Sequence, residues 1–225
     1  MTNALHATSI AILAGGHSRR MGTDKALISL FPGGPPLLKL VIDRVYGLSA
    51  DIFIVSPPRS AYSEFGIPVV PDRFDDAGPL GAIATALQAA VADVCLVVSC
   101  DMPLLNRTLL SWMMEQPRDY DVLIPQLPGT SRQDDAHVFQ TMHAMYAKRC
   151  LPAIDQALAN DQRRVASFLE QVKCSILSEC AIRQFDPECR SFLSVNSPDE
   201  LATARGILLQ SMNVTNGQRS PANEM

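Results

Sequence analysis

Short apolar runs alternate with longer amphipathic stretches along the first half of the 225-residue chain. Four of these runs have the length and apolar character of buried strands: Ser9–Leu13, Asp51–Ser56, Ile67–Val70 and Val94–Ser99. Between them, residues 37–48 and 80–91 carry apolar side chains at helical spacing. Strands that alternate with helices predict an α/β domain. The uniformly apolar run 94–99 suits the centre of a mostly parallel sheet that is covered on both faces.

The second half of the chain continues this alternation with a weaker pattern. Further strands are predicted at Asp121–Pro125, His143–Tyr146 and Phe192–Val195, and helices at 108–115, 151–159, 165–171 and 199–210. The polar stretch Gln126–Gln140 is predicted to be a surface loop. Ser197 as N-cap, Pro198 as first residue and Glu200 in the capping-box position open the last helix. The domain is therefore expected over residues 1–210, and the polar tail Ser211–Met225 is expected to be disordered.

Ligands of such sheets bind beyond the carboxyl ends of the strands, which directs attention to three loops. The first has the sequence LAGGHSRRMGTDK, from Leu13 to Lys25. Two glycines directly after a strand allow backbone N–H groups to approach an anion, and Arg19, Arg20 and Lys25 add positive charge. The segment fits neither a Walker A loop nor G-x-G-x-x-G. A triphosphate site is the functional interpretation, and a basic surface loop is the alternative.

The second loop contains Asp72, followed by a Gly-Pro-Leu-Gly turn at residues 78–81. An acid at a strand end can hydrogen-bond a ribose or a base, and the turn can present backbone groups to a base edge. Aspartate is also common in turns, so the residues alone favour a strand cap for Asp72.

The third loop begins Ser99-Cys100-Asp101-Met102-Pro103, and it places a carboxylate at the end of the most apolar strand. Mg²⁺ prefers hard oxygen ligands, usually one or two carboxylates with phosphate oxygens and water. Beside a triphosphate loop, Asp101 is therefore predicted to be a Mg²⁺ ligand, with a helix-capping turn as the alternative. Asn196 could contact phosphate near the same edge, although its spacing favours a capping role.

Composition narrows the class of protein without naming a reaction. The formal net charge is −4 and the isoelectric point is about 5.5, so a duplex nucleic acid is not an expected partner. The six cysteines form no Cys-x-x-Cys pair, which disfavours a structural zinc and indicates free thiols in a reducing compartment. With neither a signal-peptide pattern nor an apolar run of about 20 residues, a cytoplasmic protein without a membrane partner is expected.

These motifs together resemble the molybdenum cofactor guanylyltransferase family, the MobA type. The resemblance covers about residues 9–205 and rests on LAGGHSRRMGTDK at 13–25, VVPD with GPLG at 69–81, CDMP at 100–103 and FLSVNSPDEL at 192–201, with DQRRVASFL at 161–169 in support. It implies a three-layer α/β/α Rossmann-like domain whose mixed sheet carries one antiparallel strand. The implied reaction moves GMP from GTP to molybdopterin cofactor, forms molybdopterin guanine dinucleotide and releases pyrophosphate.

The resemblance also implies roles for individual residues. The backbone of Leu13, Ala14 and Gly15 would contact the nucleotide, Lys25 the phosphates and Asp72 the nucleoside. Asp101 would contact both Mg²⁺ and GTP, which makes Lys25 and Asp101 the expected catalytic pair. Arg163 and Arg164, with the arginines of the first loop, are candidates for contact with the pterin or its phosphate. Proteins of cofactor synthesis and molybdoenzymes are the protein partners that such an enzyme would meet.

Two positions depart from the family pattern. Ser56 stands where a nucleoside-contacting Asn is often found, and Ser194 stands where the family often has an earlier Asn. Both bear on selectivity for guanine. A cytidylyl or sugar-phosphate nucleotidyltransferase therefore stays open, as does a non-catalytic nucleotide-binding regulator on the same fold.

Overall fold

The computed structural model describes residues 7–15, 24–57, 60–74, 76–129 and 137–217. Their strands form one eight-stranded sheet in the order β3-β2-β1-β4-β7-β5-β6, with β8 also paired to β5. The strands are β1 (Ser9–Leu13), β2 (Ile52–Ser56), β3 (Val69–Pro71), β4 (Val94–Ser99), β5 (Val122–Pro128), β6 (His137–Phe139), β7 (His143–Ala147) and β8 (Cys174–Leu177). This is the mixed, mostly parallel sheet that the sequence predicts.

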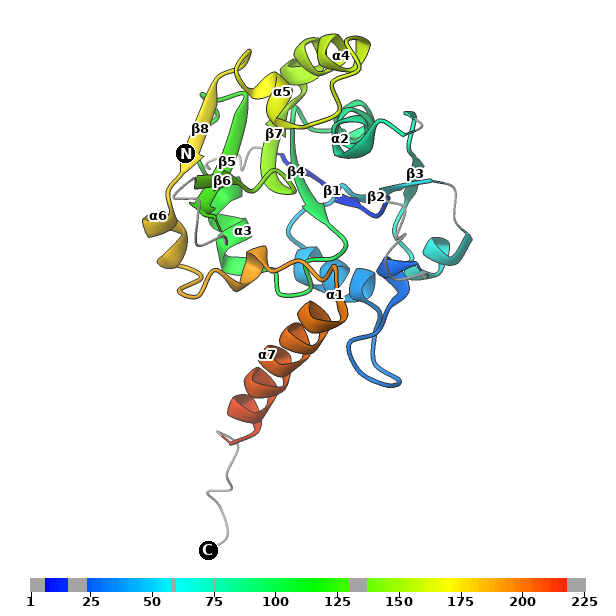
Figure 1. The fold of residues 1–225 in the computed structure, drawn as a ribbon, viewed down its shortest axis with the longest axis vertical. Helices are drawn as coiled ribbons and strands as arrows, with labels where there is room; N and C mark the ends of the chain where they lie inside the picture. Colours follow the sequence, from blue (N-terminus) through cyan, green and yellow to red (C-terminus); the bar gives the residue numbers. More distant parts are fainter. Residues whose placement is uncertain (1–6, 16–23, 58–59, 75, 130–136, 218–225) are drawn as a thin grey trace, which may run out of the picture.

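The helices cover both faces of the sheet (Figure 1). The α-helices are α1 (Leu37–Val45), α2 (Gly78–Ala89), α3 (Arg107–Met114), α4 (Leu151–Ala159), α5 (Ala166–Leu169), α6 (Glu179–Arg183) and α7 (Pro198–Gly217). Short 3-10 helices are η1 (Lys25–Leu27), η2 (Ser60–Phe65), η3 (Lys148–Cys150) and η4 (Arg190–Phe192). α1 and α3 pack on one face, and α2, α4 and α5 on the other, so the three-layer α/β/α prediction is confirmed.

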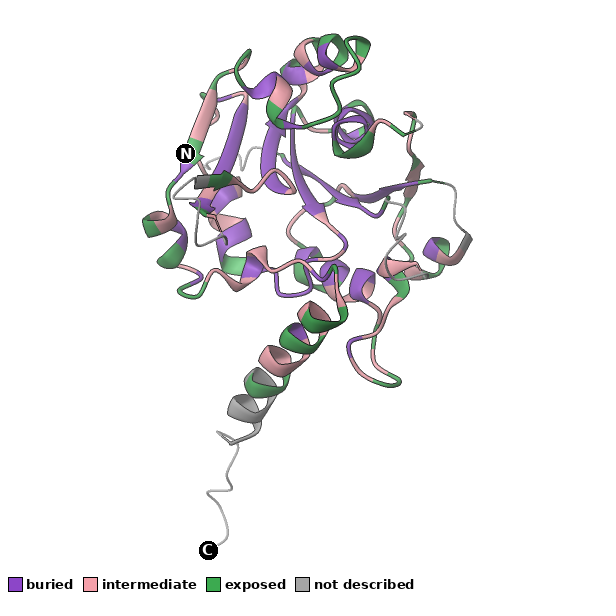
Figure 2. Cartoon of the chain, in the orientation of Figure 1, coloured by how far each residue is buried: buried purple, intermediate pink, exposed green. Residues whose placement is uncertain are grey.

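Alternation along the strands explains the two cores. In β1, Ile10 and Ile12 face the α1 and α3 layer, while Ala11 and Leu13 face the α2 and α4 layer. β4 behaves in the same way, and its residues from 94 to 98 are buried on both faces. Figure 2 shows this central part of the sheet as continuously buried. Burial on both faces is why these strands are apolar throughout instead of alternating with polar residues.

Strand direction differs in one respect from the expectation of a single antiparallel strand. β7 runs antiparallel to both β4 and β5, and the short β6 also runs antiparallel to β5. The predicted surface loop 126–140 was therefore wrong at both ends, because β5 continues to Pro128 and pairs with β6. Prolines at 125 and 128 conceal this strand from a pattern-based prediction, since proline is usually confined to strand ends or edges.

The predicted strand Phe192–Val195 was also wrong. Residues 190–192 form η4, and Val195 donates its N–H to the Asp101 carbonyl at 2.9 Å without joining the sheet. The predicted helix 165–171 shortens to α5, and β8 and α6 were not predicted at all. These elements are short, so their periodicity carries little signal.

The final helix starts as predicted, since the Ser197 hydroxyl accepts the N–H of Glu200 at 3.2 Å. It continues beyond the predicted end at Gln210 to Gly217. Residues 218–225 lie outside the described part of the chain. α7 extends away from the body, and its first half packs through Leu201 and Ala204 against Leu30 and Leu37.

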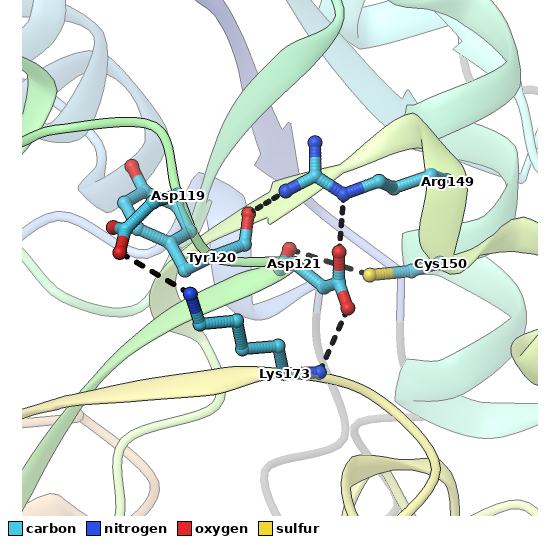
Figure 3. A network of polar contacts seen from close by, with 6 residues as sticks. All are labelled: Asp119, Tyr120, Asp121, Arg149, Cys150 and Lys173. Carbon is cyan, nitrogen blue, oxygen red and sulfur yellow. Dashed lines mark hydrogen bonds and ion pairs between the residues drawn. The ribbon is translucent and has the colours of Figure 1, made fainter.

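A polar network fixes the amino end of β5 (Figure 3). The Asp121 carboxylate accepts the N–H of Lys173 at 2.7 Å and pairs with the Arg149 guanidinium, which also bonds the Tyr120 carbonyl. Partial burial of Asp121 opposes ionisation, but the Lys173 N–H and Arg149 outweigh it and hold the pKa of this carboxyl below its ordinary value. The network lies at the edge of the sheet where β5 and β8 begin, whereas Asp101 lies at the opposite edge, where β4 ends. The network therefore anchors strands and is separate from the candidate site.

Candidate active site

Three segments that are distant in sequence bring Lys25, Asp101 and Asn196 together. The Lys25 Nζ atom donates to Asp101 Oδ2 at 2.5 Å and to Asn196 Oδ1 at 2.6 Å. The Lys25 and Asp101 side chains are only 18% and 15% exposed. The two residues predicted to be the catalytic pair thus share one site. Asn196, for which the spacing favoured a capping role, contacts the same ammonium group.

The parallel pairing of β1 with β4 explains why Lys25 and Asp101 meet. Leu13 lies opposite Ser99, and the Cys100 N–H donates to the Leu13 carbonyl at 3.0 Å, so both loops leave the sheet side by side. The third segment follows, because the N–H of Val195 donates to the carbonyl of Asp101. Backbone hydrogen bonds therefore set the arrangement of the site.

A further residue, Asp24, holds Lys25 in place. The Asp24 side chain accepts the Ala26 N–H at 3.2 Å and caps η1, in which Lys25 is the first residue. The hydroxyl of the buried Tyr62 lies 2.9 and 3.0 Å from the two oxygens of the same carboxylate. Sequence reasoning missed this role, although an aspartate directly before a helical turn is a typical N-cap.

The Asp101 carboxylate has the chemistry of a cation ligand. Oδ2 faces Lys25, while Oδ1 is buried and accepts no hydrogen bond within the described residues. A buried carboxylate oxygen is costly without a partner, and Mg²⁺ is a suitable one. No group of three or more His, Cys, Asp or Glu side chains within the described ranges could enclose a metal. A cation at Asp101 would therefore complete its shell with phosphate oxygens and water, which is how Mg²⁺ commonly binds.

Cys100, next to Asp101, has no thiolate chemistry to offer. Burial raises the pKa of its thiol far above the ordinary value, and the Asp101 charge raises it further. Only a thiolate is a good nucleophile, so the site has no covalent cysteine at this position.

Some backbone groups at the start of the first loop are already hydrogen-bonded to neighbouring strands. The Ala14 N–H donates to the Val55 carbonyl at 2.8 Å, and the Leu13 carbonyl is engaged by Cys100. Gly15 is the first exposed residue, and a Cβ atom there would lie 3.3 Å from Pro57 Cδ. Glycine therefore suits this turn on steric grounds. Residues 16–23, with Arg19 and Arg20, lie outside the described part of the chain, and nucleotide contacts by 13–15 stay a prediction.

The structure shows the capping role of Asp72, and its contact with a nucleoside stays a prediction. One carboxylate oxygen, Oδ1, accepts the Phe74 N–H at 3.2 Å and the Thr85 hydroxyl at 2.9 Å, so Asp72 caps the turn after β3. The other, Oδ2, makes no hydrogen bond within the described residues, and the side chain is half-buried. Asp72 can therefore hold the turn with one oxygen and offer the second to a ligand.

Ser56 stands where the family often has a nucleoside-contacting Asn, and its hydroxyl has a partner inside the protein. Its side chain is fully buried, and its hydroxyl donates to the Pro57 carbonyl at 2.8 Å. The hydroxyl is thus satisfied inside the protein, and only the backbone of Ser56 supports the site, through a carbonyl that accepts the Asp72 N–H at 2.9 Å.

The GPLG turn begins α2 under tight steric limits. Gly78 has φ +64°, which glycine adopts most readily, and a Cβ atom on Gly81 would approach the Ala77 and Phe74 Cβ atoms to 2.6 and 2.9 Å. Beside this turn lies a pocket of about 300 Å³, lined by Arg73, Phe74, Ala77, Leu158, Asp161 and Arg163.

The two candidate arginines near this turn differ in their surroundings. Arg163 donates to the Asp76 carbonyl at 2.7 Å and pairs with Asp161 at 3.0 Å, so much of its bonding capacity is already used. Arg164 is exposed.

A buried histidine lies close to the site edge. His143 is opposite Val98 near the end of β4 and stacks on Phe192 with ring centroids 4.5 Å apart. Burial lowers the pKa of His143 to about 4. Asp186 and the Ser191 backbone oppose this shift, but neither gives the ring a hydrogen bond of ordinary geometry within the described residues.

Sequence comparison identifies the family of this chain. Residues 10–175 match the family described as the MobA-like NTP transferase domain. The chain belongs to this family. A probable molybdenum cofactor guanylyltransferase from Pelotomaculum thermopropionicum is 35% identical over 201 residues, which cover 89% of this chain and 93% of the relative. A protein with the same description from Methanothermobacter thermautotrophicus is 30% identical and covers 86% and 96%.

Solved structures agree on the fold of this MobA-like NTP transferase. The crystal structure of molybdopterin-guanine dinucleotide biosynthesis protein A from Archaeoglobus fulgidus superimposes with a TM-score of 0.74 at 23% identity, over 90% of this chain and 99% of that one. A 4-diphosphocytidyl-2C-methyl-D-erythritol synthase from Anaerococcus prevotii gives 0.70 at 13% identity, over 92% and 100%. Among the described helices, none has the length and apolar character of a membrane span.

Proposed function

We propose that this protein transfers the GMP moiety of GTP to the phosphate of molybdopterin cofactor and releases pyrophosphate. The observation that carries the proposal is the convergence of Lys25, Asp101 and Asn196 at the carboxyl edge of the sheet. The relatives described as guanylyltransferases, which cover most of the chain, support guanine as the base and molybdopterin as the acceptor.

The transfer needs positioning and charge neutralisation more than a base. An oxygen of the acceptor phosphate would form a bond to the α-phosphorus of GTP as the bond to the β-phosphate oxygen breaks. A phosphate monoester is largely ionised at neutral pH, with its second pKa near 6, so no strong general base is needed. The task of the protein is to bring two anionic reactants together in line.

Lys25 is the side chain best placed to offset that charge. Its ammonium group lies at the edge of the sheet and is already oriented by Asp101 and Asn196. Contact with a phosphate oxygen would let Lys25 bridge the triphosphate and the Asn196 segment. Asp72, through its second oxygen, would contact the nucleoside, and Gly15 would let the loop backbone approach the phosphates.

Asp101 would hold Mg²⁺ through its unpartnered buried oxygen. A divalent cation supplies charge neutralisation across phosphate oxygens in reactions of this kind. The position of Asp101 supports this role, since the residue follows the central strand β4 and its backbone carbonyl accepts the N–H of Val195.

The decisive experiment measures pyrophosphate release and product formation with Mg²⁺, each of GTP, CTP, ATP and UTP, and either Mo-molybdopterin or a sugar phosphate as the acceptor. We expect turnover with GTP only, accompanied by a selective rise in melting temperature from binding. Preference for CTP would indicate a cytidylyl transferase, and turnover only with a sugar phosphate would indicate that alternative class. Binding of GTP without any pyrophosphate release would indicate a regulator.

A further inference from the structure

Helix α2 carries one buried hydroxyl within an otherwise apolar core. Its buried residues are Leu, Ile, Ala and Gly, with the exception of Thr85, which has no exposed surface. Burying a hydroxyl is unfavourable unless it is hydrogen-bonded, so the partners of Thr85 indicate its purpose. Two of those partners, Asp72 and Arg73, lie in the turn after β3, and the third is the Gly81 carbonyl within α2.

Thr85 belongs to a stripe on one face of α2. Gly81, Thr85 and Gln88 are spaced at i, i+4 and i+7, which places them on the same side of a helix. All three face the turn 72–74. Gly81 makes room for Phe74, since a Cβ atom there would come within 2.9 Å of Phe74 Cβ, and Gln88 accepts from the Arg73 guanidinium at 2.6 Å.

Thr85 makes the central contact of the stripe. Its Oγ1 atom lies 2.9 Å from Asp72 Oδ1 and accepts the Arg73 N–H at 3.2 Å. The hydroxyl has a single proton, and the Gly81 carbonyl at 3.1 Å competes for it. Hydrogen bonds to an ionised acceptor are stronger, so the proton goes to Asp72. Thr85 on α2 therefore holds Asp72 Oδ1, and Asp72 Oδ2 points away from this hydroxyl.

We propose that Thr85 is a positioning residue for nucleotide binding, acting by fixing the carboxylate of Asp72 so that Oδ2 faces the nucleoside. The inference rests on the proposed contact between Asp72 and the nucleoside. Thr85 itself touches neither nucleotide nor metal, because it is fully buried behind the turn.

The test compares dissociation constants for Mg·GTP by calorimetry, with melting temperature recorded for every variant. Thr85→Val keeps the shape and loses the donor, and we expect GTP affinity to fall about tenfold, as for a lost hydrogen bond to a charged group. Thr85→Ser keeps the hydroxyl and is expected to retain near wild-type affinity. Thr203→Val is the matched control, since that hydroxyl donates to the Asp199 carbonyl within α7. Wild-type affinity in a folded Thr85→Val protein would overturn the proposal.

A double-mutant cycle separates positioning from general stability. With Asp72→Ala already present, Thr85→Val should cost no further affinity, whereas a purely structural effect would add in full and refute the inference. Unchanged GTP affinity in Asp72→Ala alone would instead show that Asp72 does not contact the nucleoside. The proposed contact on which this inference rests would then be refuted. Thr85→Cys, whose thiol is a weak donor, carries the test if the valine variant does not fold, and wild-type affinity there would also count against the proposal.

Discussion

The Nζ atom of Lys25 lies 2.5 Å from Oδ2 of Asp101, so the proposed phosphate ligand and the proposed metal ligand are paired directly with each other. An ammonium group this close offsets the carboxylate charge that would attract a cation. On the proposed roles, Lys25 and a divalent metal would therefore compete for the charge of the same carboxylate, and a triphosphate that draws Lys25 away would favour the metal.

Removing this competition should strengthen metal binding. We expect Lys25→Met to bind Mn²⁺ about tenfold more tightly than the wild type when no nucleotide is added, which corresponds to about 1.4 kcal/mol. The loss of the free Mn²⁺ signal in electron paramagnetic resonance measures this affinity. Lys173→Met is the control, because Lys173 pairs with Asp119 at the opposite edge of the sheet. Equal affinities in Lys25→Met and wild type would refute the competition.

Asp101→Asn should separate catalysis from folding. The amide keeps the size of the side chain and removes the charge that would hold Mg²⁺, so turnover should drop by roughly 100-fold or more while melting temperature changes little. Pyrophosphate release at saturating GTP provides the rate. A wild-type rate at ordinary Mg²⁺ concentration would remove Asp101 from the metal site.

Ser56→Ala should leave nucleotide binding unchanged, because the hydroxyl is bonded to the Pro57 carbonyl and has no exposed surface. We expect GTP affinity within twofold of the wild type and a stability loss of about 1 kcal/mol from the lost hydrogen bond. Calorimetry measures the GTP affinity of Ser56→Ala and of the wild type. Asp72→Ala, which is expected to bind GTP more weakly, is measured in parallel. A large loss of GTP affinity in Ser56→Ala would show that the serine hydroxyl rotates toward the base.

His143 should make the fold sensitive to mild acid. Its pKa is about 4 in the folded protein, whereas an exposed imidazole in the unfolded chain has a pKa near 6.5. Between these values the unfolded chain binds more protons, so stability is complete above pH 6.5 and falls as the pH drops toward 4. The difference amounts to about 3 kcal/mol of unfolding free energy.

His143→Phe keeps the stacking on Phe192 and removes the titrating group. Urea unfolding of both proteins at several pH values between 4 and 7 should show a flatter pH dependence for the variant. Parallel curves for variant and wild type would mean that the imidazole does not control this part of the acid sensitivity.

The parts of the site that the sequence predicted are those set by strand ends. Lys25 and Asp101 follow β1 and β4, and the rule that ligands bind beyond the carboxyl ends of strands brought them to one edge. The spacing of Asn196 favoured a capping role over phosphate contact, and Thr85 was assigned no role, because the partners of both side chains are tertiary. Nothing in the spacing of Thr85 shows that this helix hydroxyl contacts Asp72. The pattern at 192–195 predicted a strand, whereas the backbone of Val195 hydrogen-bonds to the loop that holds Asp101.

The hydrogen bond from Val195 to Asp101 has a consequence for biosynthesis of the protein. All eight described strands lie before residue 178, so the sheet can form before the segment that holds Asn196 has left the ribosome. The nascent chain would carry Lys25 and Asp101 side by side and still lack the third member of the site. On the proposed function, competence for transfer would follow the formation of the sheet and would require residues 195 and 196 to dock at its carboxyl edge.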